Sequence, residues 1–527
     1  MKMPDERSEA AVTPRPGDLT VARVGVHVAR TRPDKLALHD GARKISYGQL
    51  DSDVEAIASG LVAAGVAKGD IVAAYLPNCI DYVEIVLAVA RAGAVFSPIN
   101  PRFKSYEITM LLKSGRPRVV FTTGDKVAMV ADAAVQAGLD QVQIVTTGRA
   151  AAASPQACAL DRFMDVIRRP LPSVDEDDCF SLMFTSGTTG SPKGAFGTHR
   201  ARMIWVLNAA IQYGLNEDDV YLGTMPQVHS AGLTLTLMHL YVGATVRIME
   251  HFDPLAFLDT VEREQITSSL SVPTMLAMIL EAFDKGGRHH DLSSLRRVLT
   301  CGSPLPLATK KRVIESISSE LYDYYGSTES NSMSVLKPRD QLRKPASVGQ
   351  PFTNVEIMIA TTDGKPQPPG EIGEIWCANP SVMKCYLNQP EETAEAFTGR
   401  WFHTGDLGYL DDENYLHIVG RLKDVIISGG VNIYPAEIEN VLLLHPAIFD
   451  CAVVGVDDAK WGQAVKAFVV PRQGASIDLA EVQQHCRQRL ADYKTPRHLE
   501  VISEIPKNIA GKTIKSALPA GRKAHAA

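Results

Sequence analysis

The stretch TSGTTGSPKG, from Thr185 to Gly194, follows a short apolar run and combines hydroxyl side chains, glycines and one lysine. Glycines let the backbone approach a ligand closely, and consecutive N–H groups together with Ser and Thr hydroxyls can surround phosphate oxygens. Lys193 adds positive charge, so a polyphosphate is the expected ligand. A Walker A loop needs glycine before its lysine and Ser or Thr after it, whereas Pro192 precedes Lys193 and Gly194 follows it. The stretch is therefore not a P-loop, and taken alone it is also compatible with a solvated Gly/Ser turn.

Length and composition set the class of protein. A chain of 527 residues exceeds the usual size of one hydrophobic core, so two or more domains are expected. Hydrophobic residues make up 45% and charged residues 22%, and no apolar run is long enough to span a bilayer. The net charge of −6 and the pI near 6.2 indicate neither a nucleic-acid partner nor a lipid surface. Small molecules are the expected partners.

The N-terminal segment and the cysteines indicate a cytoplasmic protein. Residues 1–20 contain charge and proline but no apolar signal-peptide core, so they are interpreted as a disordered lead-in. The cysteines show no C-x-x-C pair and no zinc-like spacing, which favours free thiols that lie mostly in the core. They are Cys79, Cys158, Cys179, Cys301, Cys377, Cys385, Cys451 and Cys486.

Strand-like and helix-like segments alternate along most of the chain. Such alternation predicts parallel sheets covered by helices. Residues 350–420 are richer in glycine and contain shorter strands, as a distorted barrel would. The predicted segments before them are a hairpin turning at Asp40-Gly41, helices over 47–66 and 80–92, and strands over 71–76, 94–99, 118–123, 244–249 and 295–301.

The pattern changes again after residues 420–430. Pro435 opens a predicted helix, and two strands, a helix near 479–494 and a last strand follow it. These elements predict a compact α+β domain of about a hundred residues, which is a normal domain size. We therefore expect one domain over 21–422 and a second over 423–527.

Further motifs contain polar side chains that could serve a nucleotide. The motif YYGSTES offers Glu329, whose carboxylate could ligate Mg²⁺ through oxygen. The motif WFHTGDLGYL places Asp406 in a glycine-flanked turn, where a carboxylate can accept two ribose hydroxyls. Taken singly, these residues are equally compatible with a strand-end turn and a capping aspartate, and Arg421 and Lys512 with solvated surface charges.

The order of these motifs resembles that of the adenylate-forming superfamily, which includes acyl-CoA synthetases, peptide-synthetase adenylation domains and firefly luciferase. From about residue 20 onward the chain presents, in the family's order, TSGTTGSPKG, PQVHSAG, YYGSTES, TGD, GRLKD and a late GK. The resemblance implies an α/β fold with a large N-terminal domain of two stacked α/β subdomains plus a distorted β-barrel, and a small mobile α+β C-terminal domain. It also implies a ligase that uses ATP, Mg²⁺ and CoA.

The resemblance implies a role for each motif in adenylation, in which a substrate carboxylate attacks the α-phosphate of ATP and pyrophosphate leaves. Thr328 is expected to contact the α-phosphate, Glu329 to position Mg²⁺, and Lys512 to bridge the α-phosphate and the carboxylate. Tyr325 is expected to stack on adenine, and Asp406 with Arg421 to hold the ribose. The implied nucleotide-binding residues are Thr185, Ser186, Gly187, Thr188, Thr189, Gly190, Lys193, Gly302, Ser303, Tyr324, Tyr325, Gly326, Thr328, Asp406, Ile418, Arg421 and Lys512.

The resemblance further implies that the acyl group passes to CoA after the small domain rotates about a hinge at Lys423. Gly429 and Gly430 would then line the tunnel for pantetheine. The implied acid-contacting residues are Val228, His229, Ser230 and Gly302.

The residues that are expected to line the acid pocket restrict the class of carboxylic acid. Ser230 stands where amino-acid-activating members usually carry an aspartate, which disfavours an α-amino acid. Mostly apolar residues near the pocket motifs favour an uncharged tail: a medium aliphatic chain, a carbocycle or an aryl group. The alternatives to CoA ligation are transfer to a carrier protein or another acceptor, luciferase-like oxygenation, and a non-enzymatic sensor, which would need a broken catalytic set. The resemblance is also compatible with a homodimer and with a lysine acetyltransferase that acts on Lys512.

Overall fold

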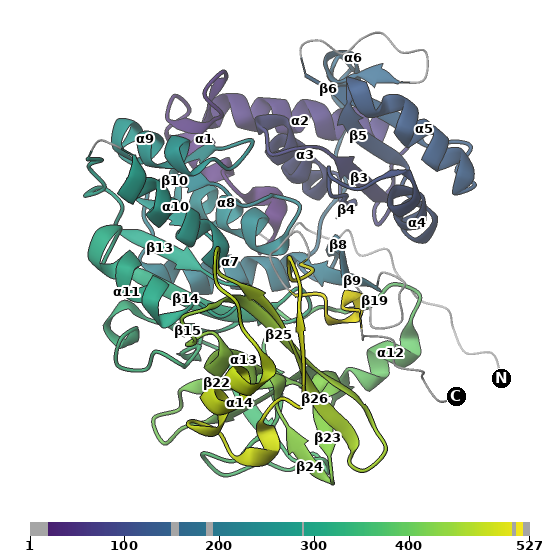
Figure 1. Cartoon of the computed structure of the whole chain (residues 1–527). Helices are drawn as coiled ribbons and strands as arrows, with labels where there is room; N and C mark the ends of the chain where they lie inside the picture. Colours follow the sequence, from purple (N-terminus) through teal and green to yellow (C-terminus); the bar gives the residue numbers. More distant parts are fainter. Residues whose placement is uncertain (1–18, 149–156, 186–192, 287–288, 508–512, 520–527) are drawn as a thin grey trace, which may run out of the picture. The chain divides into compact units, whose positions relative to one another are not determined.

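The computed structural model describes residues 19–148, 157–185, 193–286, 289–507 and 513–519. These residues form an α/β protein of helices and mixed sheets (Figure 1). Contacts between Cα atoms divide the chain into two compact units, Met1–Phe252 with Ser381–Thr393 and Asp253–Pro380 with Ala394–Ala527. The α/β class predicted from the sequence is confirmed, whereas the boundary at residue 422 stays a prediction.

The first unit contains an eight-stranded sheet whose centre is parallel. Strands β7, β6, β5, β3, β4 and β8 follow one another in parallel, and β8, β9 and β19 pair antiparallel. Parallel strands need helical crossovers, and the alternation of strands and helices in the sequence supplies them. The strands are β3 (Ile71–Tyr75), β4 (Val95–Pro98), β5 (Val119–Thr123), β6 (Gln143–Thr147), β7 (Cys158–Ala159), β8 (Cys179–Thr185), β9 (Lys193–Thr198) and β19 (Cys385–Tyr386).

The same unit holds four strands of another sheet, which pair in the order β10, β11, β1 and β2. Strands β1 and β2 form the predicted antiparallel hairpin, while β1, β10 and β11 are parallel. These strands are β1 (Leu36–His39), β2 (Lys44–Ser46), β10 (Val220–Gly223) and β11 (Thr245–Ile248). The helices of this unit are α1 (Val26–Thr31), α2 (Tyr47–Ala63), α3 (Ile80–Arg91), α4 (Ser105–Gly115), α5 (Val127–Gln136), α6 (Leu160–Met164), α7 (His199–Tyr213) and α8 (Ser230–Val242), with the 3-10 turns η1 (Val21–Arg23) and η2 (Gly124–Lys126).

Helix α2 shows how the sequence pattern positions an element. The Ser46 hydroxyl accepts a hydrogen bond from the Gln49 amide at 3.3 Å and so caps the helix start. The apolar face predicted from the spacing is fully buried. It consists of Leu50, Val54, Ile57 and Leu61.

The second unit begins with three parallel strands, β12, β13 and β14, and continues antiparallel through β15 and β16. The region predicted as a distorted barrel is an antiparallel sheet in the order β17, β18, β21 and β20, with β22 paired to β21. The strands are β12 (Ser268–Leu270), β13 (Arg297–Thr300), β14 (Leu321–Ser327), β15 (Asn331–Leu336), β16 (Gln350–Pro351), β17 (Glu356–Ala360), β18 (Gly373–Ala378), β20 (Phe397–Thr398), β21 (Trp401–Leu410) and β22 (Leu416–Arg421). The helices of this part are α9 (Pro254–Glu264), α10 (Pro273–Lys285), α11 (Leu307–Ser316) and the 3-10 turn η3 (Pro338–Asp340), and α12 spans Pro390–Glu395.

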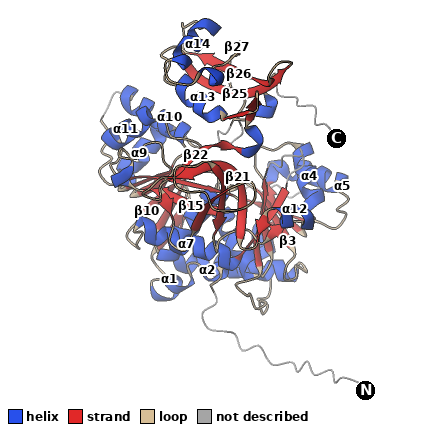
Figure 2. Ribbon diagram, turned by 90° about the horizontal axis from the view of Figure 1, so that it is seen from below, coloured by secondary structure: helices blue, strands red, loops and turns tan. Residues whose placement is uncertain are grey.

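The C-terminal elements form a small, mostly antiparallel sheet packed against α13 and α14 (Figure 2). Pro435 occupies the first turn of α13, as the sequence predicts. Helix α14 ends at Arg487, earlier than predicted, because the chain turns at Gln488 and brings Leu490 against the buried core. The elements are η4 (Leu422–Asp424), β23 (Ile426–Ser428), β24 (Val431–Ile433), α13 (Pro435–Leu442), β25 (Ile448–Asp458), β26 (Gly462–Pro471), α14 (Leu479–Arg487), η5 (Asp492–Lys494), β27 (His498–Val501) and η6 (Lys515–Ala517).

All eight cysteines are free thiols, as the sequence predicts. Four of them are buried, and burial raises the pKa of the Cys377 thiol to about 12 and that of the Cys486 thiol to about 11. Such thiols stay protonated at neutral pH and behave as small apolar side chains.

Candidate active site

The expected phosphate loop connects two strands of the first unit. Thr185 ends β8 and Lys193 begins β9, and the two residues are paired antiparallel, with the Thr185 hydroxyl 3.4 Å from the Lys193 carbonyl oxygen. This pairing holds both ends of the loop together at one end of strands β8 and β9. The intervening residues predicted to bind phosphate lie outside the described residues. They are Ser186, Gly187, Thr188, Thr189 and Gly190.

Close packing of β9 against side chains of β8 explains the glycine at position 194, directly after Lys193. A Cβ at Gly194 would lie 2.8 Å from Leu182 Cδ1 and 3.1 Å from a ring carbon of Phe184. A larger residue would push β9 away from β8. On the other side, the Lys193 ammonium lies 5.3 Å from the centroid of the Tyr386 ring, within cation–π range.

Thr328 and Glu329 lie in the tight turn between β14 and β15. Ser327 and Ser330 close this turn, because the Ser330 hydroxyl accepts from the Ser327 amide at 3.1 Å and the Ser327 hydroxyl accepts from the Ser330 amide at 3.0 Å. The Asn379 side chain donates to the Ser330 carbonyl at 2.8 Å. Two reciprocal hydrogen bonds between Ser327 and Ser330 therefore hold the turn that carries Thr328 and Glu329.

Gly326 permits this turn. A Cβ at that position would lie 2.0 Å from the carbonyl oxygen of Asn331, which is closer than any side chain allows. Asn331 itself adopts a left-handed conformation with φ of 54°. The YG-x-TE motif thus needs glycine at position 326, because the backbones of β14 and β15 come too close there for a side chain.

Asp406 and Arg421 are brought together by strand pairing. They are direct partners across β21 and β22, and Arg421 Nε lies 2.7 Å from Asp406 Oδ1. The Tyr325 hydroxyl donates to Asp406 Oδ2 at 2.5 Å. Burial, and next the negative charge of Asp406, raise the pKa of Tyr325 well above its usual value. The phenol therefore stays protonated and acts as a hydrogen-bond donor.

A further set of contacts fixes the turn that carries Asp406. The Thr404 hydroxyl donates to the Ile375 carbonyl at 2.7 Å and accepts from the Asp406 amide at 3.0 Å. The Glu374 carboxylate accepts from the Gly405 amide at 3.0 Å. Ile418, predicted to contact the nucleotide, packs with Tyr325 against one apolar cluster of this sheet.

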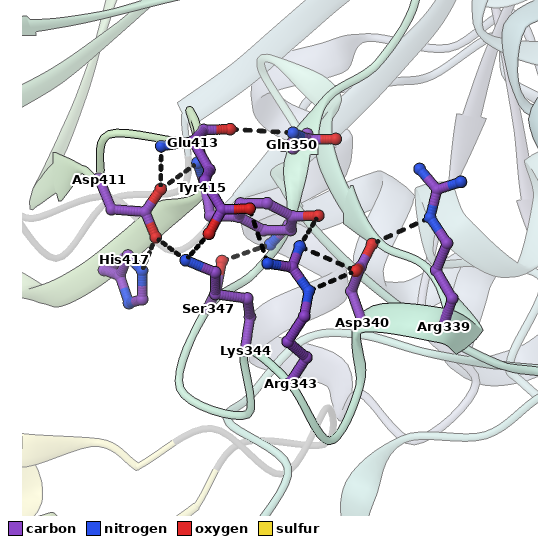
Figure 3. A network of polar contacts seen from close by, with 11 residues as sticks. Arg339, Asp340, Arg343, Lys344, Ser347, Gln350, Asp411, Glu413, Tyr415 and His417 are labelled. Carbon is purple, nitrogen blue, oxygen red and sulfur yellow. Dashed lines mark hydrogen bonds and ion pairs between the residues drawn. The ribbon is translucent and has the colours of Figure 1, made fainter.

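A polar network stabilises the opposite end of the β21–β22 hairpin (Figure 3). The Lys344 ammonium lies 2.9 Å from Asp411 Oδ2, and Arg343 Nη1 lies 2.6 Å from Glu413 Oε2. Burial would raise the pKa of Asp411, but hydrogen bonds from Lys344, the Tyr415 amide and His417 lower it below its usual range. Asp411 is therefore a structural carboxylate on the same hairpin as Asp406.

Gly302 and Ser303 follow strand β13. Gly302 has φ of +90°, a conformation that favours glycine, and it is exposed. The neighbouring Cys301 and Tyr324 are both buried, and burial raises the pKa of the Cys301 thiol to about 12. The exposed backbone of Gly302 therefore lies next to the buried residues Cys301 and Tyr324. An exposed glycine backbone suits close approach of a ligand.

The segment with Val228, His229 and Ser230 leads into helix α8, with His229 at the N-cap position. The His229 amide donates to the Pro226 carbonyl at 3.0 Å, and a Cβ at Gly232 would lie 2.6 Å from the same oxygen. The glycine that ends the PQVHSAG motif is thus required by close packing of the first helical turn.

Residues that the sequence motifs did not identify hold this segment in place. The Asn78 side-chain amide donates to the Met225 carbonyl at 3.0 Å, and its oxygen accepts from the Gln227 amide at 2.8 Å. The Tyr82 hydroxyl donates to the Gln227 carbonyl at 3.1 Å. Both side chains come from β3–α3, more than a hundred residues upstream, so local sequence gave no signal for them.

The expected hinge and tunnel residues lie in two turns. Lys423 is the exposed middle residue of the 3-10 turn η4, directly after β22. Gly429 and Gly430 form the two-residue turn between β23 and β24, with φ of 59° and 81°. A Cβ at Gly429 would lie 2.8 Å from the Trp461 ring. Such a turn requires positive φ at both positions, which explains the glycine pair.

Lys512 lies outside the described residues. No helix among the described residues is long and apolar enough to cross a membrane. The described part of the chain also holds no group of three or more His, Cys, Asp or Glu side chains arranged for a metal ion.

Comparison with known proteins supports the resemblance. The AMP-binding enzyme family matches residues 26–387, and the AMP-binding enzyme C-terminal domain matches residues 437–512. The chain is 39% identical to a feruloyl-CoA synthase of Amycolatopsis, over 93% of this chain and 96% of that protein. It is 35% identical to a 2-succinylbenzoate–CoA ligase of Geobacillus kaustophilus, over 92% of this chain and 95% of that protein.

The fold leads to the same group of proteins. The o-succinylbenzoate CoA synthetase of Bacillus subtilis, solved in complex with its acyl-adenylate intermediate, superposes with a TM-score of 0.83 at 30% identity. That match covers 95% of this chain and 98% of the other. The chain therefore belongs to the AMP-binding enzyme family, as an AMP-forming acyl-CoA synthetase.

Proposed function

We propose that the chain activates an aryl or carbocyclic carboxylic acid as its acyl-adenylate and then transfers the acyl group to CoA, releasing AMP and pyrophosphate. The observation that carries this most directly is the buried carboxylate of Asp406, held by Arg421 and Tyr325. Each oxygen of this carboxylate has one protein donor and retains lone pairs for ribose hydroxyls. Strand pairing fixes its position before the nucleotide binds, which lowers the cost of ordering the site.

In the adenylation half-reaction, donors and cations aimed at the phosphates would stabilise the negative charge that develops on the phosphoryl oxygens. Thr185, Lys193 and the loop between them would hold the β- and γ-phosphates, and Thr328 the α-phosphate. Lys512 would bridge the α-phosphate and the attacking carboxylate, while Tyr325 and Ile418 would border the adenine.

Mg²⁺ would be held at Glu329. Protein sites for this ion commonly supply one or two carboxylates, while phosphate oxygens and water complete the octahedral shell. A single carboxylate on a rigid turn suits that arrangement, which needs no cluster of acidic side chains. The ion would screen the charge of the phosphates during displacement.

In the second half-reaction, the thiol of CoA would attack the acyl-adenylate. Rotation about Lys423 would withdraw Lys512 and bring the turn of Gly429 and Gly430 to the thiol's entrance. Alternation of this kind would let one cavity serve two geometries and protect the mixed anhydride from water. The exposed position of Lys423 in a short turn between two strands is compatible with such a hinge.

The acid class is supported by the relatives and by the segment around His229. Feruloyl and 2-succinylbenzoyl groups, named for two of the relatives, both contain an aromatic ring. Val228 and Ser230 flank His229 at the start of α8, and burial lowers the pKa of His229, which favours the neutral imidazole. The neutral imidazole of His229 suits contact with an aryl or carbocyclic body.

Two finer features belong to the same proposal. Acetylation of Lys512 would remove the charge that the adenylation transition state needs and would silence the first half-reaction. The enzyme would work in the cytoplasm, with a homodimer as a compatible assembly.

The proposal is tested by separating the two half-reactions in Lys512→Ala. Adenylate formation should slow by roughly 10²–10³, comparable to removing one preorganised transition-state donor. Thioester formation from preformed acyl-AMP should be retained, because Lys512 would already have left the site. The assay uses a panel of aryl, carbocyclic and aliphatic acids and follows AMP release with and without CoA.

Lys515→Ala is the matched control, since this nearby lysine pairs with Glu439 at 2.7 Å and bonds the Val453 carbonyl at 2.9 Å. It should leave both half-reactions intact. Equal loss of both half-reactions in Lys512→Ala would assign Lys512 a structural role, and AMP release that is independent of CoA would contradict CoA as the acceptor.

A further inference from the structure

Arg202 is a buried cation on helix α7, with only 4% of its surface exposed. Its Nη1 donates to the Ser230 hydroxyl at 2.9 Å and to the Thr234 hydroxyl, both on helix α8. The guanidinium carbon lies 5.2 Å from the centroid of the Trp205 ring. The Nε atom is buried and has no hydrogen-bond partner in the described part of the chain.

No carboxylate among the described residues neutralises the charge of Arg202. Every acidic side chain of the described residues lies beyond ion-pair distance of this guanidinium, and its hydrogen-bonding partners are neutral hydroxyls. Burial lowers the pKa of Arg202 to about 10, so the side chain is still charged at neutral pH. A buried charge without a counter-charge is costly, and proteins seldom keep one without a use.

The surroundings of Arg202 add to its preference for an anion. Ser230 is the first residue of α8, a helix of 13 residues, and His229 at the N-cap gives no side-chain cap. The N-terminus of a helix carries partial positive charge and free N–H donors. The Nε2 atom of His229 is also buried without a partner in the described part of the chain. A cation, a helix N-terminus and an uncapped first turn therefore meet at Ser230.

Ser230 is also a residue that the family resemblance assigns to the acid pocket. We propose that the acid carries a second oxyanion, a carboxylate or a sulfonate, remote from the reacting carboxylate, and that Arg202 recognises it together with Ser230 at the start of α8. This inference rests on the proposed function and deepens it, because it specifies a second anionic group on the acid substrate, at the end remote from the reacting carboxylate. The incoming oxyanion would supply the counter-charge that Arg202 does not receive from the described residues.

A purely structural role makes a different prediction. If Arg202 only ties α7 to α8 through two hydroxyls, its removal would weaken the fold and reduce the activity on all acids equally. If Arg202 binds an oxyanion, its removal would change the preference between acids that differ only in that group.

The test compares matched acids: hexanoate with adipate and 5-sulfopentanoate, and 3-phenylpropanoate with 3-(2-carboxyphenyl)propanoate. The wild type should prefer the acids with two anionic groups by at least about tenfold in kcat/KM, mostly through KM. Arg202→Met should lose about 10- to 100-fold on these acids, the usual effect of losing a charged hydrogen bond, and little on their uncharged partners. Arg202→Lys should retain part of the preference, and comparison of adipate with 5-sulfopentanoate identifies the oxyanion.

Arg200→Met is the matched control on the same helix, because Arg200 is partly exposed and its Nε pairs with Asp177 at 3.0 Å. It should leave the preference unchanged. A wild type that prefers the uncharged acid of each pair, or an Arg202→Met variant that loses both members equally, would overturn the inference while the proposed function stands.

Two further measurements keep the inference decidable. If Arg202→Met fails to fold, Ser230→Ala replaces it with the same expected loss of preference, and Arg202→Lys with a smaller loss. If no acid yields a thioester, the proposed function fails, and the inference is decided by the shift in melting temperature that adipate causes in the presence of AMP. A shift in the wild type that hexanoate does not cause supports it, and equal shifts, or none, overturn it.

Discussion

Arg421 and Asp406 face each other as direct partners across two paired strands, with Nε of the arginine 2.7 Å from Oδ1 of the aspartate. The two residues lie at the open end of the hairpin formed by β21 and β22. The turn at the other end carries the polar network around Asp411. The hairpin therefore separates the end that is proposed to bind the ribose from the end that the Asp411 network stabilises. Two aspartates on one element can be compared directly.

Asp406→Asn should weaken nucleotide binding, and Asp411→Asn should weaken the fold. The amide at 406 loses the ion pair with Arg421 and one acceptor for the ribose, so KM for ATP should rise by about 10- to 100-fold, as expected for a lost charged hydrogen bond. The amide at 411 loses the attraction of Lys344, so the melting temperature should fall while KM for ATP stays within about twofold. Steady-state kinetics and thermal melts of both variants measure this.

Acid titration gives an independent check on Asp411. Its pKa in the folded protein lies below the unfolded value, so its contribution to stability is present above the unfolded pKa and is lost as the pH falls through the folded one. The stability difference between the wild type and Asp411→Asn should therefore shrink as the pH falls below about 4. An unchanged difference between pH 3 and pH 7, or an increase in KM at Asp411→Asn as large as at Asp406→Asn, would contradict the division of the hairpin.

The motifs proposed to contact the nucleotide lie in short segments and could be identified from the sequence. The contacts that join distant segments could not. Asp406 and Arg421 appear in recognisable motifs, and the register of one hairpin places them together. The role of Asn78 depends on the approach of α3 to the segment before α8, which no local pattern records. Arg202 lies in the stretch HRAR, where one alanine separates two arginines, and only packing against α8 shows that Arg202 is buried while Arg200 is partly exposed.

Gly232→Ala should destabilise helix α8 although alanine usually stabilises a helix. The new Cβ would lie 2.6 Å from the Pro226 carbonyl oxygen, so the first turn must shift away from the preceding segment. Overpacking of this kind costs about 1–3 kcal/mol, which exceeds the gain of about 1 kcal/mol in helix propensity. The shift should also raise KM for the acid more than KM for ATP, because His229 and Ser230 move with the turn. A higher melting temperature with unchanged kinetics would show that the turn has room for a methyl group.

Glu84→Gln should stabilise the protein increasingly as the pH rises from 5 to 8. Glu84 is buried on α3, and burial raises its pKa to about 8, although Arg43, 3.4 Å away, opposes this. A folded pKa above the unfolded one means that the stabilising contribution is complete below pH 4.5 and is lost as the pH rises toward 8. Glutamine cannot ionise, so the difference in melting temperature between the variant and the wild type should grow through this window and then level off.

Glu55→Gln serves as the control, because Glu55 is only partly buried and lies 3.3 Å from Arg91. The melting temperatures of both variants and of the wild type are measured across the same pH range. A flat difference for Glu84→Gln between pH 5 and pH 9 would show that Arg43 keeps the carboxylate ionised throughout.

Proline substitutions in η4 should distinguish a hinge from a simple linker. Arg421, before the turn, is extended with φ of −109° and ψ of 140°, a conformation that proline tolerates in the residue it follows. Leu422→Pro therefore fits the turn seen here and should leave the ratio of adenylation to thioester formation unchanged.

Lys423→Pro instead fixes φ at 423 and disfavours the helical conformation of Leu422, so it restricts the dihedral angles on which rotation would depend. We expect pyrophosphate exchange to persist and thioester formation to fall by orders of magnitude in Lys423→Pro, measured with protein whose melting temperature matches that of Leu422→Pro. An equal ratio of the two half-reactions in both variants would show that the small domain does not rotate about this position.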